Sequence, residues 1–594
     1  MQIRYKNNRL EKVLIVANVL AGALVTASFV CLFGFDEPLL QERVLYDLQV
    51  ALLCVFVAEK IIRLFNAVSK AEFFRGSWVE IPLLVALGIV LFGAGHYFDK
   101  LETIMVRHFA VGIYLILQVV VKACRTVVDL AASGRSPAQT LIASFLVLII
   151  SGAGLLMLPK ASVAENIGPV DALFTATSAT CVTGLIVKDT GKDFSLMGQV
   201  VILSLIQLGG LGIVVFGAVL GLLLGLSLSV RESAAMQDLL SADTLSRISN
   251  MILFVFVGTV SIEAIGALSL FSVWDNVPDK VSNVHQQWFC SIFHSISAFC
   301  NSGFSLFSDS FIGYNKSWQV YTVICPLIIM GGLGFGVLYD LLSNISDRVT
   351  RFFKRLFVKR YTILMEPPKR MRLQTKVVLS ITACLIVFGM LTLLLFERYA
   401  RGGDTMGDIG VRGALFQSIT ARTAGFNTVD IAKLTPASKF ILILLMFIGG
   451  SPGGTAGGIK TVTLAVVIMS VVATLRKRDE VEMFKRSIRH VVVRRAITVM
   501  VFFVMVLFTA CLTLSITERE NDFTMLDIIF QAASALGTVG LTTGITPLLT
   551  TAGKLIIIVV MLIGRLGPLT LLAALTFNIR PVRYSYPDEA VIVG

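Results

Sequence analysis

Charged residues are scarce in this chain of 594 residues, making up 15% of it against 56% for hydrophobic residues. Soluble domains carry about a quarter charged and about half apolar residues. Apolar runs long enough to cross the roughly 30 Å hydrocarbon core of a bilayer recur from one end of the chain to the other. This composition argues against a soluble enzyme and predicts a multi-pass membrane protein with almost no soluble domain.

Catalytic and metal-binding motifs are also missing. The nine cysteines form no CxxC pair, the five histidines show no HExxH spacing, and no GxGD motif stands on a predicted span. A membrane-embedded hydrolase would need a nucleophile with a base, or a carboxylate pair, in one cavity. The sequence also lacks a GxGxxG dinucleotide motif. We therefore expect no enzyme activity, no metal site built from side chains and no organic cofactor in this chain.

The net charge of +13 does not indicate nucleic acid binding. The basic residues cluster in short loops between spans, most densely over 348–376 and 476–495, whereas loops such as 36–37 and 518–520 are acidic or mixed. The positive-inside rule places the basic loops in the cytoplasm. We expect a cell inner (plasma) membrane protein, surrounded by lipid, with both termini cytoplasmic.

One short signature occurs four times, each time between two long apolar runs. The copies begin at Phe174, Phe293, Phe416 and Phe530, and a glycine follows ten residues later, or nine in the third copy. A helix of about a dozen residues reaches about 18 Å, which is too short to cross a bilayer. Each segment is therefore expected to enter the membrane and turn back, and four of them suggest a four-fold arrangement around one pore.

An extended strip ending in glycine follows each predicted short helix. The strips are Cys181-Val182-Thr183-Gly184, Cys300-Asn301-Ser302-Gly303, Thr423-Ala424-Gly425 and Thr538-Val539-Gly540. Glycine permits backbone conformations in which carbonyl oxygens point inward and replace the water around a cation. The negative C-terminal ends of the short helices would face the same cavity. The strips therefore predict a cation selectivity filter.

The predicted fold class is an all-α integral membrane protein of four span–pore-loop–span repeats, preceded by four extra N-terminal transmembrane helices. The predicted domains are a helical extension (1–130) and pore repeats over 131–235, 236–350, 351–482 and 483–594. The extension faintly resembles a voltage sensor in its second and third helices. Its fourth helix lacks a regular arginine ladder, so an accessory bundle that stiffens a dimer or contacts a partner is the favoured interpretation.

A glycine-rich stretch interrupts the second span of the third repeat and should break the helix. Its residues are Gly449, Gly450, Ser451, Pro452, Gly453, Gly454, Thr455, Ala456, Gly457 and Gly458. On its own this pattern fits a gate or a helix-packing notch. Arg565 lies in the middle of the last span, where it would either repel cations in the pore or form a buried ion pair.

Four further polar residues lie near the strips. Asp189, Asp309 and Asp430 follow the first three strips and would form either an acidic outer vestibule or caps of the following helices. Arg422 precedes the third strip. Because its charge would repel cations, we expect it to support the filter from behind.

Several motifs resemble the Trk/Ktr/HKT superfamily of potassium and sodium uptake channels, and most closely its Ktr-type membrane subunits. They are VTGL (182–185), FHSISAF (293–299), ARTAGFNTVD (421–430), FIGGSPGGTAGGIKT (447–461), IGRLGPLT (563–570) and the ending YSYPDEAVIVG. Over about 136–594, the resemblance implies a pseudo-tetrameric pore, a homodimer with two pores, and a cytosolic ring of KtrA/TrkA-like nucleotide-binding regulatory subunits. It also implies that 449–458 is a gating loop and that Arg565 contributes to the barrier.

The resemblance further implies K⁺ as the transported ion, held by backbone carbonyls of the filter. In the HKT relatives a serine in the first repeat accompanies sodium preference, so Gly184 favours potassium. A sodium-permeable or sodium-coupled transporter is the alternative, and a role for Na⁺ as activator is left open.

Overall fold

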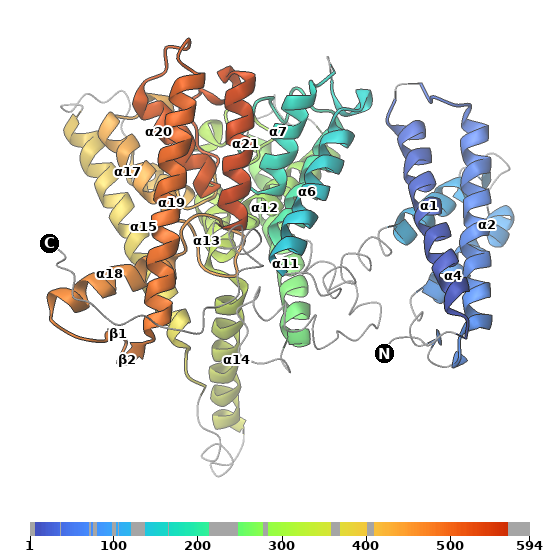
Figure 1. Ribbon diagram of the computed structural model, residues 1–594, viewed down its shortest axis with the longest axis horizontal. Helices are drawn as coiled ribbons and strands as arrows, with labels where there is room; N and C mark the ends of the chain where they lie inside the picture. The colour runs from blue at the N-terminus through green and yellow to red at the C-terminus, as the bar shows by residue number, and fades with distance from the viewer. Residues whose placement is uncertain are drawn as a thin grey trace, which may run out of the picture.

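The computed structural model describes residues 6–35, 37–70, 73–74, 80–97, 103–104, 106–119, 137–163, 166–212, 248–276, 283–357, 369–400 and 409–567. Helices are the main secondary structure of these residues (Figure 1). Within them, the single sheet is a two-stranded hairpin.

The N-terminal helices form a small bundle that stands apart from the other helices in Figure 1. It contains α1 (Asn8–Phe33), α2 (Glu42–Asn66), α4 (Glu80–Tyr97) and a helix over Val106–Val119. Inside it, Glu59 on α2 accepts a hydrogen bond from Asn18 of α1 (2.6 Å) and pairs with Arg63 (2.6 Å). The described part of the fourth helix carries one arginine, Arg107, and so has no arginine ladder. The sequence predicts the fourth span over about 103–125, and residues 120–125 of it lie outside the described residues.

The rest of the chain consists of four units, each with a long helix, a short helix and a second apolar helix. The first is α6 (Pro137–Leu156), α7 (Pro169–Thr180) and α8 (Leu196–Leu211). The second is α11 (Ile248–Leu270), α12 (Val284–Phe299), α13 (Cys325–Leu333) and α14 (Phe335–Phe357). The third is α15 (Leu373–Ala400), α16 (Val411–Thr420), α17 (Pro436–Phe447) and α18 (Thr461–Leu475). The fourth is α19 (His490–Thr517), α20 (Met525–Gly537) and α21 (Thr551–Leu566).

The units are arranged in a closed circle. Each short helix packs against the second helix of the preceding unit: α12 against α8, α16 against α13 and α20 against α17, while α7 packs against α21 and closes the circle. The phenylalanine that opens each signature is fully buried in this packing: Phe174, Phe293, Phe416 and Phe530. The four copies of the signature therefore occupy equivalent places.

The second apolar helix of the third unit, α17, ends at the glycine-rich stretch, as the sequence predicted, and in the other three units this helix ends just before a glycine that the sequence analysis did not single out. Helices α8, α13 and α21 end at Gly212, Gly334 and Gly567, whose φ angles are +81°, +88° and +80°. Glycine takes this left-handed conformation at no steric penalty, and it ends a helix. The break at Gly334 bends the chain by 107°, and α14 then runs to Phe357, past the predicted repeat boundary at residue 350.

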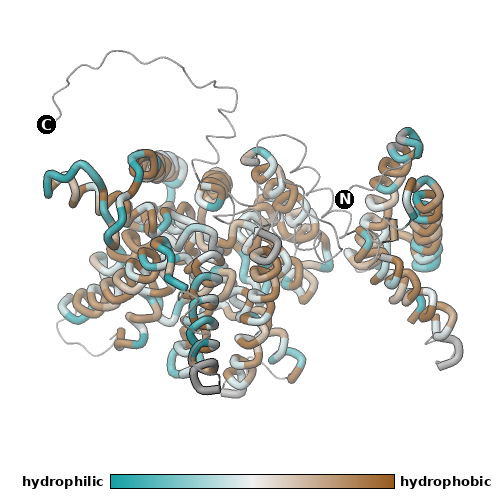
Figure 2. The backbone as a smooth tube through the Cα atoms, turned by 90° about the horizontal axis from the view of Figure 1, so that it is seen from below, coloured by the Kyte–Doolittle hydropathy of each residue, from teal (hydrophilic) through white to brown (hydrophobic). Residues whose placement is uncertain are grey.

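Apolar side chains cover the outer surface of the helical circle. Among the described residues, five helices are long and apolar enough to cross a membrane, and the bent α13–α14 pair would make a sixth. Exposed residues on the long helices include Val147, Leu268, Leu395 and Phe508, and hydrophobic colouring predominates along the helices in Figure 2. Such a surface is compatible with lipid and not with water.

The remaining elements are short. Helical turns occupy Pro159–Ala161, Phe271–Asn276, Ile312–Tyr314, Val320–Ile324, Ile431–Lys433 and Thr546–Leu548. Strands β1 (Val481–Met483) and β2 (Arg486–Ile488) pair antiparallel with Val481 opposite Ile488. Phe484 and Lys485 between them both have positive φ, as a tight two-residue hairpin turn requires.

Candidate functional site

Each predicted filter strip follows directly on the C-terminal end of a short helix and is buried. A hydroxyl residue four positions after the signature phenylalanine braces each strip: Ser178, Ser297, Thr420 and Ser534. The carbonyls of these residues accept backbone N–H groups from Thr183, Ser302, Ala424 and Val539. The hydroxyls of Ser178 and Ser534 also accept from the amides of Gly184 and Gly540, both at 3.1 Å, whereas the Thr420 hydroxyl donates to the carbonyl of Phe426, just after its strip. The sequence interpretation did not assign these hydroxyls, although they are part of the repeated signature.

The backbone of the four strips follows the same unusual path. The residue two positions before each glycine has positive φ: Val182 (+56°), Asn301 (+59°), Thr423 (+77°) and Thr538 (+50°). The glycines Gly184, Gly303, Gly425 and Gly540 also have positive φ, between +70° and +92°. A left-handed residue other than glycine costs about 1–3 kcal/mol and persists only where its surroundings enforce it. Four equivalent cases show that the strips share one conformation, which their surroundings enforce.

The four glycines form a closed ring. A β-carbon placed on Gly184 would meet the carbonyl of Ser302, and one on Gly303 would meet the carbonyl of Ala424 at 2.7 Å. A β-carbon on Gly425 would meet the carbonyl of Val539, and one on Gly540 that of Thr183, which closes the ring. Each glycine therefore abuts the carbonyl that precedes the next glycine. Because there is no space for a side chain, only glycine fits at these four positions.

The glycine-rich stretch, residues 449–458, forms a loop between α17 and α18. It is fastened to the end of α13: Ser451 N donates to Gly332 O (2.9 Å), Thr455 N to Gly331 O (3.3 Å), and Phe335 N to Gly453 O (3.0 Å). Thr455 also donates its hydroxyl to the carbonyl of Phe299, the last residue of α12, at 3.3 Å. The loop therefore lies at the C-terminal ends of the short helices.

The loop also reaches the fourth strip. A β-carbon on Gly457 would collide with the Thr538 side chain, so the loop and this strip are in contact through a residue that has to be small. Residues predicted together as a filter and a gate are thus neighbours in space.

Two cationic side chains bind adjacent carbonyls of the loop. The Arg565 guanidinium on α21 donates from Nη1 to the carbonyl of Thr455. Its Nη2 donates to Gly209 O (2.5 Å) and Gly210 O (3.2 Å) at the C-terminus of α8, where a helix favours positive charge. Lys460 donates from Nζ to the carbonyl of Ala456 (2.6 Å). Arg565 thus donates hydrogen bonds to backbone carbonyls and does not form the buried ion pair that the sequence left open. The sequence analysis assigned no role to Lys460.

Arg565 stands where the other units have glycine. The second helices end in Gly209-Gly210-Leu211-Gly212, Gly331-Gly332-Leu333-Gly334 and Gly564-Arg565-Leu566-Gly567, and the third unit has Gly449-Gly450 at this place. The first glycine of each complete motif packs on the end of its own short helix, against the carbonyls of Thr180, Phe299 and Leu536. The repeat was visible in the sequence and identifies Arg565 as the exception to a glycine pattern.

A buried carboxyl group lies behind the second strip. Glu263, in the middle of α11, accepts a hydrogen bond from Gln207 Nε2 of α8 at 3.1 Å. Cys300 Sγ is 3.6 Å from Gln207 Oε1 and 3.9 Å from Glu263 Oε1. An ionisable residue at membrane depth is a functional candidate by default. Here Glu263 links the second unit to the first through Gln207. Gln207 lies on α8 two residues before Gly209, whose carbonyl Arg565 binds.

The predicted vestibule carboxylates bind nearby backbone. Asp189 Oδ1 accepts from the amides of Gly191 (2.9 Å) and Lys192 (3.1 Å), and Asp430 Oδ1 accepts from the amide of Ala432 (3.0 Å). Asp309 is exposed in the loop that follows the second strip. A shared acidic vestibule stays a prediction.

Arg422 points away from the ring. Its guanidinium lies 3.5 Å from the carbonyl oxygen and 3.4 Å from the hydroxyl of Thr382 on α15. This position, outside the ring, is the one expected for a residue that supports the third strip from behind.

The chemistry of the ring suits a partly dehydrated cation. The strips contain no charged side chain, and the groups that meet around the four glycines are backbone carbonyls. Carbonyl oxygens in this arrangement can replace the hydration shell of a monovalent cation. The C-terminal ends of four helices adjoin the ring and favour positive charge there, and Arg565 is a fixed positive charge at the same end.

The number and length of the apolar helices define the molecule as a multi-pass helical membrane protein. A family model described as "TrkH: Cation transport protein" matches residues 106–580. The chain belongs to this family of cation transport proteins, which confirms the resemblance inferred from the repeated motifs. The match begins upstream of residue 136, where the resemblance was expected to start, and leaves residues 1–105 outside.

Relatives match most of the chain. The Ktr system potassium uptake protein B of Bacillus subtilis is 40% identical over 472 residues, which is 77% of this chain and 97% of the relative. The potassium/sodium uptake protein NtpJ of Enterococcus hirae is 36% identical over 467 residues, covering 77% of this chain and 97% of the relative. The crystal structure of the potassium transporter TrkH from Vibrio parahaemolyticus matches with a TM-score of 0.57 at 19% identity, over 85% of this chain and 98% of that one.

Proposed function

We propose that this chain is the pore subunit of a Ktr/Trk-type potassium uptake system that conducts K⁺ passively. The single observation that carries the proposal is the closed ring of Gly184, Gly303, Gly425 and Gly540. A ring of backbone carbonyls next to glycines is the chemistry that selects a dehydrated monovalent cation. The relatives named for potassium uptake support the choice of ion.

The four strips act as the selectivity filter in this proposal. A cation loses water against the carbonyls of residues 181–184, 300–303, 423–425 and 538–540. It then enters the cavity at the C-terminal ends of α7, α12, α16 and α20, which their helix dipoles make favourable for a cation. The strict backbone conformation of the strips, with two positive φ angles in each, keeps the oxygens in place for this exchange.

The loop over 449–458 and Arg565 form the gate. The loop is bonded to α13 and contacts the fourth strip, while the Arg565 guanidinium joins the loop to α8. The loop therefore contacts several units of the circle at the inner end of the filter. Breaking these bonds would let the loop move aside and would withdraw a positive charge from the cation path.

Cytosolic nucleotide-binding subunits control this gate, and the chain works as a homodimer in the inner membrane with both termini cytoplasmic. The basic loops over 348–376 and 476–495 support this orientation through the positive-inside rule. The relative named as a protein of a Ktr system supports a multi-subunit assembly.

A sodium-permeable or sodium-coupled transporter is the second candidate. The relative named as a potassium/sodium uptake protein favours it. Glycine at all four ring positions favours potassium, and Na⁺ would then act as an activator instead of the transported ion.

The proposal is tested by ion flux in proteoliposomes that contain this chain alone, loaded with K⁺ or Na⁺. We expect K⁺ flux well above Na⁺ flux, and a large increase on deletion of residues 450–456. Equal fluxes of the two ions would favour the second candidate. A deletion variant that folds but conducts no more than the wild type would refute the gate.

A further inference from the structure

Helix α14 begins at the loop. The amide of Phe335, its first residue, donates to the carbonyl of Gly453 at 3.0 Å. A β-carbon on the preceding Gly334 would meet the carbonyl of Pro452 at 2.6 Å, so backbone is packed on backbone here. The chain bends by 107° at this point, and α14 then projects below the rest of the circle (Figure 1). Any movement of α14 is therefore transmitted to the middle of the loop.

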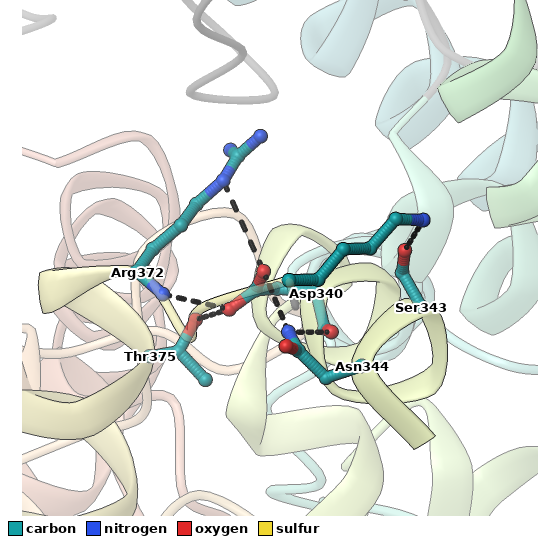
Figure 3. Close-up of polar contacts among 6 residues, drawn as sticks. Asp340, Ser343, Asn344, Arg372 and Thr375 are labelled. Carbon is teal, nitrogen blue, oxygen red and sulfur yellow. Dashed lines mark hydrogen bonds and ion pairs between the residues drawn. The ribbon is translucent and has the colours of Figure 1, made fainter. Parts of the chain in front are cut away.

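A buried carboxylate on α14 binds the first turn of the next long helix. Asp340 Oδ2 accepts from the Thr375 hydroxyl at 2.6 Å and from the amide of Arg372 at 3.1 Å, at the N-terminus of α15 (Figure 3). Amides in the first turn of a helix have no partner within the helix, and the helix dipole favours a negative charge there. Asp340 is 8% exposed, so these charge-assisted bonds are protected from water.

Neighbouring contacts orient this carboxylate and extend the joint. Asn344, one turn along α14, donates to Asp340 Oδ1 at 3.2 Å, and the Arg372 guanidinium lies 4.0 Å from the same oxygen. Further down, Lys369 donates from Nζ to Ser343 Oγ at 2.9 Å. Helix α14 is thus joined to the start of α15 close to its loop end, while its far end projects beyond the joint (Figure 1).

We propose that Asp340 is a positioning residue that holds α14, and through Phe335 the loop, in the non-conducting arrangement. The inference rests on the proposed gating role of the loop. In this scheme α14 is a lever whose pivot is the bond between Asp340 and the first turn of α15. A force on the projecting end of α14 rotates the helix about the Asp340–Thr375 contact and moves the Phe335 amide away from the Gly453 carbonyl.

The test measures K⁺ flux in proteoliposomes made with the full-length chain and no partner. Asp340→Ala and Thr375→Val remove the two sides of the bond, and Thr375→Ser keeps the hydroxyl as the matched control. We expect about a tenfold rise in flux for the first two variants, equivalent to about 1.4 kcal/mol, the order expected for one hydrogen bond to a charged group. Thr375→Ser should conduct like the wild type, and the K⁺/Na⁺ ratio should stay unchanged in all three.

The deletion of residues 450–456 separates gating from general damage. Adding Asp340→Ala to this deletion should give no further rise in flux, whereas a residue with a purely structural role would change both backgrounds alike. If the deletion raises flux but folded Asp340→Ala and Thr375→Val do not, the pivot is refuted and the gate stands. If the deletion itself does not raise flux, the proposed gating role of the loop is refuted, and the role of Asp340 that rests on it is refuted as well. Should Asp340→Ala not fold, the comparison of Thr375→Val with Thr375→Ser decides.

Discussion

Replacing Gly184 by serine tests the glycine ring directly. The residue has φ +88°, and a β-carbon on it would collide with the carbonyl of Ser302. The left-handed conformation costs an L-residue about 1–2 kcal/mol, and relief of the collision has to move a backbone carbonyl of the neighbouring strip. Because this carbonyl belongs to the ring, the substitution should damage ion selection more than stability.

The expected result is a fall of at least about tenfold in the K⁺/Na⁺ flux ratio, since a loss of about 1.4 kcal/mol in differential binding gives this factor. The ratio is measured in proteoliposomes under opposite K⁺ and Na⁺ gradients. Gly303→Ser should have a smaller effect, because a β-carbon there would meet the Ala424 carbonyl at 2.7 Å, less closely than the contact at Gly184.

Gly544→Ser is the matched control. Gly544 has φ +100° and no atom within 4 Å of its β-carbon position, so serine there brings the same kind of backbone strain without a collision. Its flux ratio should match that of the wild type. An unchanged ratio in Gly184→Ser, or an equal loss in Gly544→Ser, would refute the reasoning.

Three more predictions concern the site. Arg565→Gln removes the charge that bonds the Thr455 carbonyl and should raise partner-free K⁺ flux severalfold. Flux at the wild-type level would show that this bond does not hold the loop in place. Ser534→Ala leaves the buried amide of Gly540 without its acceptor, which costs about 1–3 kcal/mol of stability, and should lower the K⁺/Na⁺ flux ratio. An unaltered ratio would show that the hydroxyl does not brace the strip. Glu263→Leu should lower the melting temperature in detergent more than Glu263→Gln, which keeps an acceptor at this position; equal melting temperatures would argue against the bond.

The sequence predicted the parts of the site that recur. The fully buried Phe174, Phe293, Phe416 and Phe530 and the glycines that follow them show as repeats because four equivalent places need the same residue. The glycine-rich stretch was also recognisable, since so many glycines cannot continue a helix.

Features that depend on the pairing of distant segments could not be predicted in this way. Nothing local in the sequence links Asp340 to Thr375, 35 residues away, or Arg565 to Gly209, 356 residues away. Likewise, the bend at Gly334 lies in an apolar run that reads as a continuous span. Only the packing of Gly334 against the carbonyl of Pro452 in the loop shows why the chain turns there.

The single arginine among equivalent glycines has a consequence for how such a molecule can be assembled. Four identical subunits would have to carry either four arginines at the inner mouth or none. Four positive charges would repel one another and every cation, and four glycines would leave the loop carbonyl of Thr455 without its partner. Joining four units in one chain allows one corner of a nearly symmetrical ring to differ from the other three. For the proposed gate, covalent linkage would therefore permit a barrier to ions that is removed by moving one side chain.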